Sequence, residues 1–333
     1  MAELSVGAGL VRGLLDFAAS RGAARTDLLE RSGIDPAGLE DQDNRIAFDA
    51  YVVLMRAAKA LTGDPALALH YGEGVDMADL SIVALLGGEC ETVLEALPLV
   101  NRYSPLAIEV DAGGGDRIEA VRRDGKLWIV DRRPNPNAFP ELTESSFARM
   151  VCSGRRHGFD QLRQVHVTHP APPYRAEYER IFQVPVVFAS GWNALEVDEA
   201  VMAMRVPPQP RYVGALLSER AEALLAELES SKTMRGRVES LLVPMLHTGA
   251  AGIEAAAARM GLSRQTLYRR LKAEAVTFES VRDALRHRLA LDYLGGGKVS
   301  IGEAAWRLGF SDRAAFSRAF KRWTGAAPGA MRH

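Results

Sequence analysis

The last third of the chain contains one helix–turn–helix pattern written twice, and this repeat limits the possible folds more than any other feature. Residues 253–260 align with 301–308 at a shift of 48, and a glycine follows each segment, at positions 261 and 309. Glycine readily adopts the left-handed conformation that ends a helix and reverses the chain. Residues 264–272 then align with 313–321 at a shift of 49. We therefore expect two helix–turn–helix units, with one extra residue in the second turn.

The second helix of each unit is expected to have one apolar face and one face rich in hydrogen-bond donors. Leucines at 267 and 271, and phenylalanines at 316 and 320, recur at helical spacing, and Ser263 and Asp312 are the expected N-caps. A helix that enters the major groove needs cations for phosphates and polar side chains for base edges. The predicted DNA-binding residues are Arg264, Gln265, Tyr268, Arg269, Lys272, Arg313, Ala314, Ser317, Arg318 and Lys321. The alternative is a small helical bundle whose basic faces are only solvated.

A longer helix is expected between the two units, from Thr277 to Leu294. Its apolar residues recur every fourth position, Thr277 can cap its start, and the glycines at 295–297 can end it. A helix of about 17 residues is about 25 Å long. Such a spacer could hold the two recognition helices about 34 Å apart, so that both enter successive major grooves on one side of a duplex.

Residues 233–333 closely resemble the DNA-binding domain of the AraC family of bacterial transcription regulators. The stretch from Ile301 to Gly325, followed by Pro328, is similar to the family signature over its whole length. The resemblance implies that both recognition helices read DNA, through Gln265, Tyr268, Arg269, Arg313, Ala314 and Arg318. Ala314 and Ala315 stand where the family often has polar residues. The second unit is therefore expected to read thymine methyl groups or mainly phosphates.

The charge of the chain is divided between its two ends. Residues 231–333 contain 18 lysine and arginine residues against 8 aspartate and glutamate residues, and residues 1–230 contain 23 against 34. The two regions carry net charges of +10 and −11, which suggests nucleic acid at one end only. The acidic part could also serve only to keep the protein soluble.

Composition also limits the other classes of function. The chain has 333 residues, enough for two or three domains, and its two cysteines lie 62 positions apart. This spacing does not suggest a disulfide framework or a zinc site. Since the chain has no run of 18 apolar residues and no signal-peptide pattern, we expect a cytoplasmic protein without a membrane segment, a metal or a cofactor.

The N-terminal part is expected to combine a helical lobe with a sheet. Residues 5–103 are expected to be helical, with one helix starting near Val6 and another at Ile46. After Pro105, segments 106–110, 117–122 and 127–132 are expected to form an antiparallel meander, with Asp124-Gly125 as a hairpin turn. Further strands are expected at 164–168, 184–189 and 194–197, and further helices at 142–152 and 174–182. The expected fold is an α+β domain with an antiparallel-rich sheet, followed by an all-α domain of two helix–turn–helix units.

Residues 1–200 also resemble the arabinose-binding-like N-terminal domain of one branch of the AraC family. The segments that carry this resemblance are 28–35, 44–46, 61–65 and 165–170. It implies an effector-binding and dimerising domain, although members of the branch respond to varied small molecules. We expect an α+β regulatory domain at 1–206, a linker at 207–232 and the DNA-binding domain at 233–333. In the linker, Tyr212 to Leu228 is either a dimerising helix or a helix that packs on its own domain.

Several N-terminal features allow alternatives to be weighed. The basic segments Arg132-Arg133 and Arg155-Arg156-His157 either bind an acidic effector or are solvated. The aromatic residues Tyr103, Trp128, Phe139 and Phe147 line a pocket or belong to the core. His166 and His169 are expected to point to opposite faces of a strand, which disfavours a shared metal.

The sequence therefore predicts a transcription regulator that binds specific double-stranded DNA sites as a homodimer and responds to an unknown small-molecule effector. The sequence is compatible with an activator, which would have RNA polymerase as a further partner, and equally with a repressor. A second hypothesis is a hydrolase or alkyl-transfer enzyme with an appended DNA-binding domain. Alkyl transfer needs a reactive cysteine beside positive charge, and neither Cys90 nor Cys152 fits well. A third hypothesis is a nucleoid-type binder without an effector.

Overall fold

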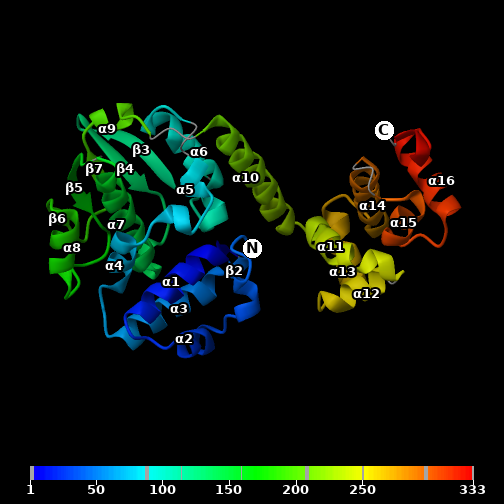
Figure 1. Ribbon diagram of the computed structural model, residues 1–333. Helices are drawn as coiled ribbons and strands as arrows, with labels where there is room; N and C mark the ends of the chain where they lie inside the picture. Colours follow the sequence, from blue (N-terminus) through cyan, green and yellow to red (C-terminus); the bar gives the residue numbers. More distant parts are fainter. Residues whose placement is uncertain are drawn as a thin grey trace. The chain divides into compact units, whose positions relative to one another are not determined.

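The computed structural model describes residues 4–86, 90–113, 115–158, 160–206, 210–249, 251–295 and 299–331 (Figure 1). It divides into two compact units, Met1–Leu225 and Ala226–His333. Residues 207–209 of the expected linker and the glycines at 296–297 lie outside the described residues. None of the described helices is long and apolar enough to cross a bilayer.

The first unit begins with a helical lobe whose core is built from the apolar faces of its helices. Leu14, Leu15, Leu54 and Met55 are fully buried there. The elements of the lobe are β1 (Ser5–Gly7), α1 (Ala8–Ser20), α2 (Arg25–Ser32), β2 (Arg45–Ala47), α3 (Phe48–Thr62), α4 (Leu67–Gly74), α5 (Val83–Leu86) and α6 (Val93–Ala107).

Two short strands replace the helix starts that were expected at Val6 and Ile46. β1 and β2 pair antiparallel, with Val6 opposite Ile46. Arg45 holds the pair in place, since its Nε donates to Ser5 Oγ at 3.0 Å and its Nη2 donates to the backbone oxygens of Ser5 and Pro105 at 3.0 and 2.9 Å. These contacts join segments far apart in the sequence, and helical periodicity alone does not reveal them.

Helix α6 continues through Pro105, so the strand expected at 106–110 is absent from this part of the structure. Only Ile108 makes an isolated bridge, to Val6. Proline has no N–H to donate within a helix. Ser104 Oγ donates to the backbone oxygen of Asn101 at 3.0 Å and satisfies the acceptor that Pro105 leaves open.

The sheet of the first unit has the order β3-β4-β7-β5-β6, and all its pairings are antiparallel except that of β5 with β6. The antiparallel-rich sheet is confirmed, but the three-strand meander is wrong, because residues 106–110 form no strand beside β3 and β4 pairs on its other side with the distant β7. Asp124 and Gly125 form the two-residue hairpin turn with φ of 54° and 72°. The strands are β3 (Ile118–Arg123), β4 (Lys126–Asp131), β5 (Leu162–His166), β6 (Val186–Val187) and β7 (Ala194–Val197).

Helix α7 (Pro140–Arg156) connects the sheet to the helical lobe. Phe147 and Val151 of α7 pack with Val165 and Leu195 of the sheet and with α8 (Arg175–Phe182). Another face of α7 packs against α4, which lies beside it in Figure 1. A Cβ on Gly72 would lie 2.3 Å from the backbone oxygen of Ser145, so only glycine permits this close approach.

After α9 (Ala200–Ala203), helix α10 (Arg211–Ser231) covers part of the first unit, and the boundary between the units falls within it. Ala221 and Leu225 are buried in the core of the first unit. Glu222 accepts hydrogen bonds from Tyr103 at 2.6 Å and Arg102 at 2.7 Å. This part of α10 therefore packs on its own domain, whereas Tyr212, Val213 and Leu216 are exposed.

The second unit is all-α and has one core, formed by residues such as Val238, Leu267, Leu285, Phe316 and Phe320. Figure 1 shows α14 between the pair α12–α13 and the pair α15–α16. The elements are α11 (Met234–Leu242), a 3-10 segment (Val243–Thr248), α12 (Ile253–Arg259), α13 (Arg264–Ala273), α14 (Phe278–Gly295), α15 (Ile301–Arg307), α16 (Arg313–Thr324) and a 3-10 segment (Pro328–Met331).

Candidate nucleic-acid interface

The first helix–turn–helix unit has the turn and the cap that its sequence predicts. Gly261 has φ of 64°, and the N–H of Leu262 donates back to the oxygen of Ala257 at 2.9 Å. Ser263 Oγ then accepts from the N–H of Thr266 at 3.1 Å and caps α13. The turn at Gly261 and the cap at Ser263 therefore fix the direction in which α13 leaves the turn.

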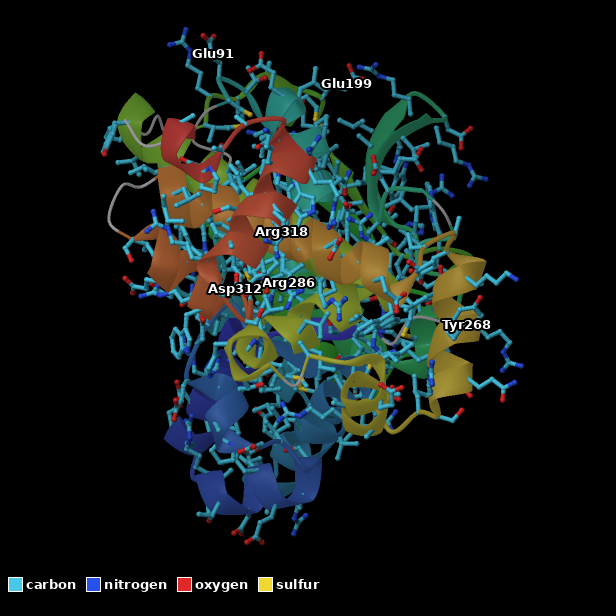
Figure 2. All side chains as sticks on the ribbon, turned by 90° about the vertical axis from the view of Figure 1, so that its right-hand side faces the viewer. Glu91, Glu199, Tyr268, Arg286, Asp312 and Arg318 are labelled. Carbon is cyan, nitrogen blue, oxygen red and sulfur yellow. The ribbon has the colours of Figure 1, made fainter. Side chains whose placement is uncertain are left out.

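Helix α13 buries one face and exposes the predicted DNA-binding face. Leu267 and Leu271 are buried, and Tyr268 is 53% exposed. Figure 2 shows Tyr268 on α13, at the right-hand edge of the view. Arg264 lies 3.2 Å from Glu254 of α12 in an exposed ion pair, which competing phosphates can replace at little cost. The exposed residues include all five of the predicted set: Arg264, Gln265, Tyr268, Arg269 and Lys272.

The second turn is built like the first but is more crowded. Gly309 has φ of 70°, and a Cβ at this position would lie 2.0 Å from the backbone oxygen of Leu246. Asp312 caps α16 by accepting from the N–H of Ala315 at 2.7 Å. This backbone hydrogen bond, aided by Ser311, lowers the pKa of Asp312. The sequence predicted the turn and the cap, but it did not reveal the contact with Leu246.

Helix α16 repeats the division into two faces. Phe316 and Phe320 are fully buried, Arg318 is exposed, and Ser317 is half-buried. Arg322 lies 2.9 Å from Asp283 of α14, so its guanidinium already forms an ion pair within the protein. The exposed residues of the predicted set are Arg313, Ala314, Arg318 and Lys321.

Helix α14 supports the second turn through a residue that sequence reasoning missed. Its start has the expected cap, since Thr277 and Ser280 exchange N–H to hydroxyl hydrogen bonds of 3.0 and 3.1 Å. Arg286 donates to the backbone oxygens of Leu308 and Gly309 at 2.9 and 3.1 Å. Burial lowers the pKa of Arg286. An arginine beside the inward-facing Leu285 was the available signal, but its partners lie more than twenty residues away.

Helix α13 is also tied to the start of the second unit. Glu274, which follows α13, accepts from the N–H groups of Met234 and Arg235 at 2.6 and 2.9 Å, at the N-terminus of α11. A carboxylate at this position satisfies free helical donors and the positive end of the helix dipole. The buried Glu239 pairs with Arg235 at 2.9 Å and Arg288 at 3.1 Å, which joins α11 to α14.

The aromatic residues that were considered as a pocket lining belong to the core of the first unit. Tyr103, Trp128, Phe139 and Phe147 are all buried in the core. No group of three or more metal-ligating side chains occurs among the described residues.

The two histidines have separate partners. His166 Nδ1 lies 2.9 Å from Ser190 Oγ, and His169 Nε2 lies 2.8 Å from the Tyr178 hydroxyl.

The environment of Cys152 does not favour a reactive thiolate. Burial raises the pKa of its thiol, whereas a nucleophilic cysteine needs a lowered pKa.

The basic pairs that were considered for an acidic effector have structural partners. Arg132 donates to Glu119 at 2.7 Å, and Arg133 donates to Asp131 at 3.1 Å. Arg155 donates to Asp160 and to the backbone oxygen of Ile181. Arg156 makes long contacts, of 3.4 and 3.5 Å, with the backbone oxygens of Glu73 and Val75.

An apolar cavity of about 190 Å³ lies between the sheet, α6, α7 and α9. Gln161 is its only polar side chain among the described lining residues. The lining residues are Val93, Ile129, Met150, Val151, Gly154, Gln161, Leu162, Leu195, Val197, Val201 and Met202.

The chain is similar to known proteins over both of its units. Residues 22–206 match the family described as the arabinose-binding domain of AraC transcription regulators, N-terminal, and residues 256–333 match a helix-turn-helix domain. The ornithine utilization regulator of Pseudomonas aeruginosa is 28% identical over 323 residues, which cover 95% of this chain and 92% of that protein.

Two further proteins align over nearly the whole chain. The regulator VirS of Mycobacterium tuberculosis is 25% identical over 322 residues, covering 95% of this chain and 93% of VirS. The crystal structure of the transcriptional regulator CdpR from Pseudomonas aeruginosa is 22% identical and covers 97% of each chain, with a TM-score of 0.43.

Proposed function

Since the chain belongs to the AraC family of transcription regulators, we propose that α13 and α16 are its two recognition helices and that both enter the major groove of its operator. The protein is a DNA-binding regulator with an N-terminal ligand-binding domain. Family membership confirms that it is not an enzyme, and the hypothesis of a hydrolase or alkyl-transfer enzyme is withdrawn.

One observation carries this proposal: α13 and α16 each bury an apolar stripe and expose a cationic, donor-rich face behind a glycine turn and a polar cap. In the proposal, Gln265, Tyr268 and Arg269 read bases in one groove, and Arg313 and Arg318 read bases in the next. Ala314 contacts a thymine methyl group. The remaining residues, Arg264, Lys272, Ser317 and Lys321, contact phosphates and set the register.

The other parts of the chain are assigned regulatory roles in the same proposal. Residues 1–206 bind the effector, residues 207–232 connect the domains and residues 233–333 bind DNA. The effector shifts the population between a state that binds the operator and one that does not. We propose a homodimer that acts in the cytoplasm as an activator and contacts RNA polymerase.

Selection of operator sites from a randomised DNA library by the full-length protein tests the proposal. Two recognition helices in successive grooves predict that the site of each protomer has two conserved blocks whose centres lie about 10 base pairs apart. A motif with one conserved block would show that only one of the two helices reads bases, contrary to the proposal. Enrichment of no sequence at all would instead support the nucleoid-type binder.

A further inference from the structure

The apolar cavity of the first unit is enclosed by elements that lie far apart in the sequence. The sheet lines it with residues of β4, β5 and β7, and α7 lines it with residues 150, 151 and 154. Val93 of α6 and Val201 and Met202 of α9 complete the lining. All of these residues belong to the first unit, so that unit forms the cavity by itself.

The segment that contains α9 is held to the start of α6 by backbone hydrogen bonds. The N–H of Val93 donates to the oxygen of Met204 at 3.1 Å. The N–H of Val206 donates to the oxygen of Glu91 at 3.0 Å. Because these bonds join α9 to α6 directly, the side of the cavity formed by the two helices is a fixed part of the fold.

The lining of the cavity sets the polarity of a ligand. No charged side chain occurs among the described lining residues, and Gln161, just before β5, is half-buried. The backbone oxygen of Gln161 accepts from the N–H of Asp198 at 2.9 Å, whereas its side-chain amide makes no hydrogen bond to another described residue. That amide offers one acceptor and two donor hydrogens. A charged group, or the several hydroxyls of a sugar, would lose hydration without gaining partners.

The volume of the cavity sets the size of a ligand. An apolar cavity of about 150 Å³ stays dry and binds benzene, which has six carbon atoms. On that scale the 190 Å³ found here accommodates about seven or eight carbon atoms. Met150 and Met202 belong to the lining, and methionine side chains adjust readily to the shape of a neighbour. A short alkyl chain and a single substituted ring therefore both suit the cavity.

Helix α6 contacts both the cavity and the helix that leaves the first unit. Val93, its first residue, lines the cavity. Further along, Tyr103 and Arg102 donate to Glu222 of α10 at 2.6 and 2.7 Å. The boundary between the units falls within α10. A ligand in the cavity therefore touches a helix that also holds the connection to the DNA-binding unit.

We propose that this cavity is the effector site and that the effector is a neutral molecule with an apolar part of about seven or eight carbon atoms. One small polar group of the effector hydrogen-bonds to Gln161. Burial of the apolar part supplies most of the affinity, and Gln161 sets the orientation. The site rests on the proposed function, since it assumes that the first unit binds an effector.

Thermal unfolding of the full-length protein with primary amides of increasing chain length tests the size and polarity of the site. The probes are butanamide, hexanamide, octanamide and decanamide, and the dissociation constants follow from the rise of Tm with concentration. Each methylene that fits should tighten binding about fourfold, which corresponds to about 0.8 kcal/mol. The gain should stop or reverse at decanamide, which exceeds the volume of the cavity. Octanoate and arabinose should not raise the Tm at the same concentrations.

A variant that fills the cavity tests its location. Val201→Phe reduces the space by about two carbon atoms and should weaken binding of octanamide by about tenfold. Val187→Phe is the matched control, because Val187 of β6 is 36% exposed and does not belong to the lining. It should leave the affinity unchanged.

A second variant keeps the test decisive if Val201→Phe does not fold. Gln161→Leu removes the polar group of the lining and leaves a side chain of similar size. It should weaken binding of benzamide about three- to tenfold, the contribution of a hydrogen bond, and leave binding of toluene unchanged. Equal effects on the two compounds would overturn the role of Gln161.

The cavity is overturned as a ligand site if no amide raises the Tm, if affinity does not depend on chain length, or if Val201→Phe and the wild type bind octanamide equally. Its effector role requires that octanamide change the affinity for the selected operator by about fivefold or more. Binding without such a change would overturn that role. Val201→Phe should still select the operator motif of the wild type without ligand, so failure of the cavity is distinguishable from failure of the DNA-binding proposal.

Discussion

Arg286 of α14 donates from Nε to the backbone oxygen of Leu308 at 2.9 Å, and this hydrogen bond ties the central helix to the turn of the second helix–turn–helix unit. The same guanidinium donates to Gly309 and lies 4.7 Å from the centre of the Phe310 ring. Three consecutive residues of the turn are therefore held by one side chain. This anchor fixes the base from which α16 presents Arg313 and Arg318.

Replacing Arg286 should loosen the second unit locally. Arg286→Met leaves two backbone oxygens without their donor, and hydrogen bonds to charged groups contribute about 1.5–3 kcal/mol. We expect the free energy of local opening to fall by about that amount. Hydrogen exchange at amides of residues 301–310 in the full-length protein measures it. The exposed Arg313→Met is the matched control, and an equal effect of the two changes would contradict the assigned role of Arg286.

The two turn glycines form a natural pair for comparison. Both have positive φ, 64° at Gly261 and 70° at Gly309. They differ in the space around them: no neighbouring atom lies within 4 Å of a Cβ built on Gly261, whereas a Cβ built on Gly309 would lie 2.0 Å from the backbone oxygen of Leu246. Gly261→Ala should cost about 1–2 kcal/mol, from backbone strain alone. Gly309→Ala should cost about 2–5 kcal/mol, because overlap is added to strain. Chemical unfolding of the two full-length variants decides the order, and equal costs would mean that Leu246 moves away freely.

The pH dependence of the second unit should include a contribution from the cap of α16. The backbone hydrogen bond from Ala315 lowers the pKa of Asp312, so the folded state prefers the carboxylate. The stabilisation is complete above the unfolded pKa of about 3.9 and is lost as the pH falls through the lower folded value. Asp312→Asn can still accept the capping hydrogen bond, so it should keep most of the helix start but lose this pH dependence.

Hydrogen exchange at residues 313–316 between pH 3 and 5 measures the effect of the cap. Asp312→Ala, which lacks the acceptor, should increase exchange at every pH in that range. An unchanged exchange rate in this variant would show that the side chain does not cap the helix in solution.

The features that the sequence predicts well are those whose causes are local. The apolar stripe, the turn glycine and the N-cap of each recognition helix lie within about a dozen residues of one another. The hairpin at Asp124-Gly125 is equally local, since both residues accept positive φ. The exposed face of α13 follows directly, because burial of Leu267 and Leu271 leaves Arg269 on the other side.

The features that the sequence does not reveal depend on distant partners. β1 becomes a strand because β2 pairs with it and the Arg45 side chain of β2 donates to the backbone oxygen of Ser5. The apolar periodicity near Val6 does not reveal this distant partner. α6 passes Pro105 because Ser104 bonds to the open acceptor. Whether an arginine anchors a turn, as Arg286 does, is decided by tertiary packing.

Arg269 and Lys272 of α13 are both exposed, and they should affect DNA binding in different ways. The Arg269 guanidinium can bond to two acceptors of one guanine, so Arg269→Ala should cost about 1–3 kcal/mol at the operator and relax preference at a single base pair. Lys272→Ala should weaken binding to all sequences alike and reduce the slope of log K against log salt by about one. Titrations of the operator and of single-base variants at several salt concentrations separate the two effects. Ala273→Ser, an exposed change at the end of the same helix, should alter neither quantity. Uniform weakening by Arg269→Ala would reassign Arg269 to a phosphate and leave base reading in α13 to Gln265 and Tyr268.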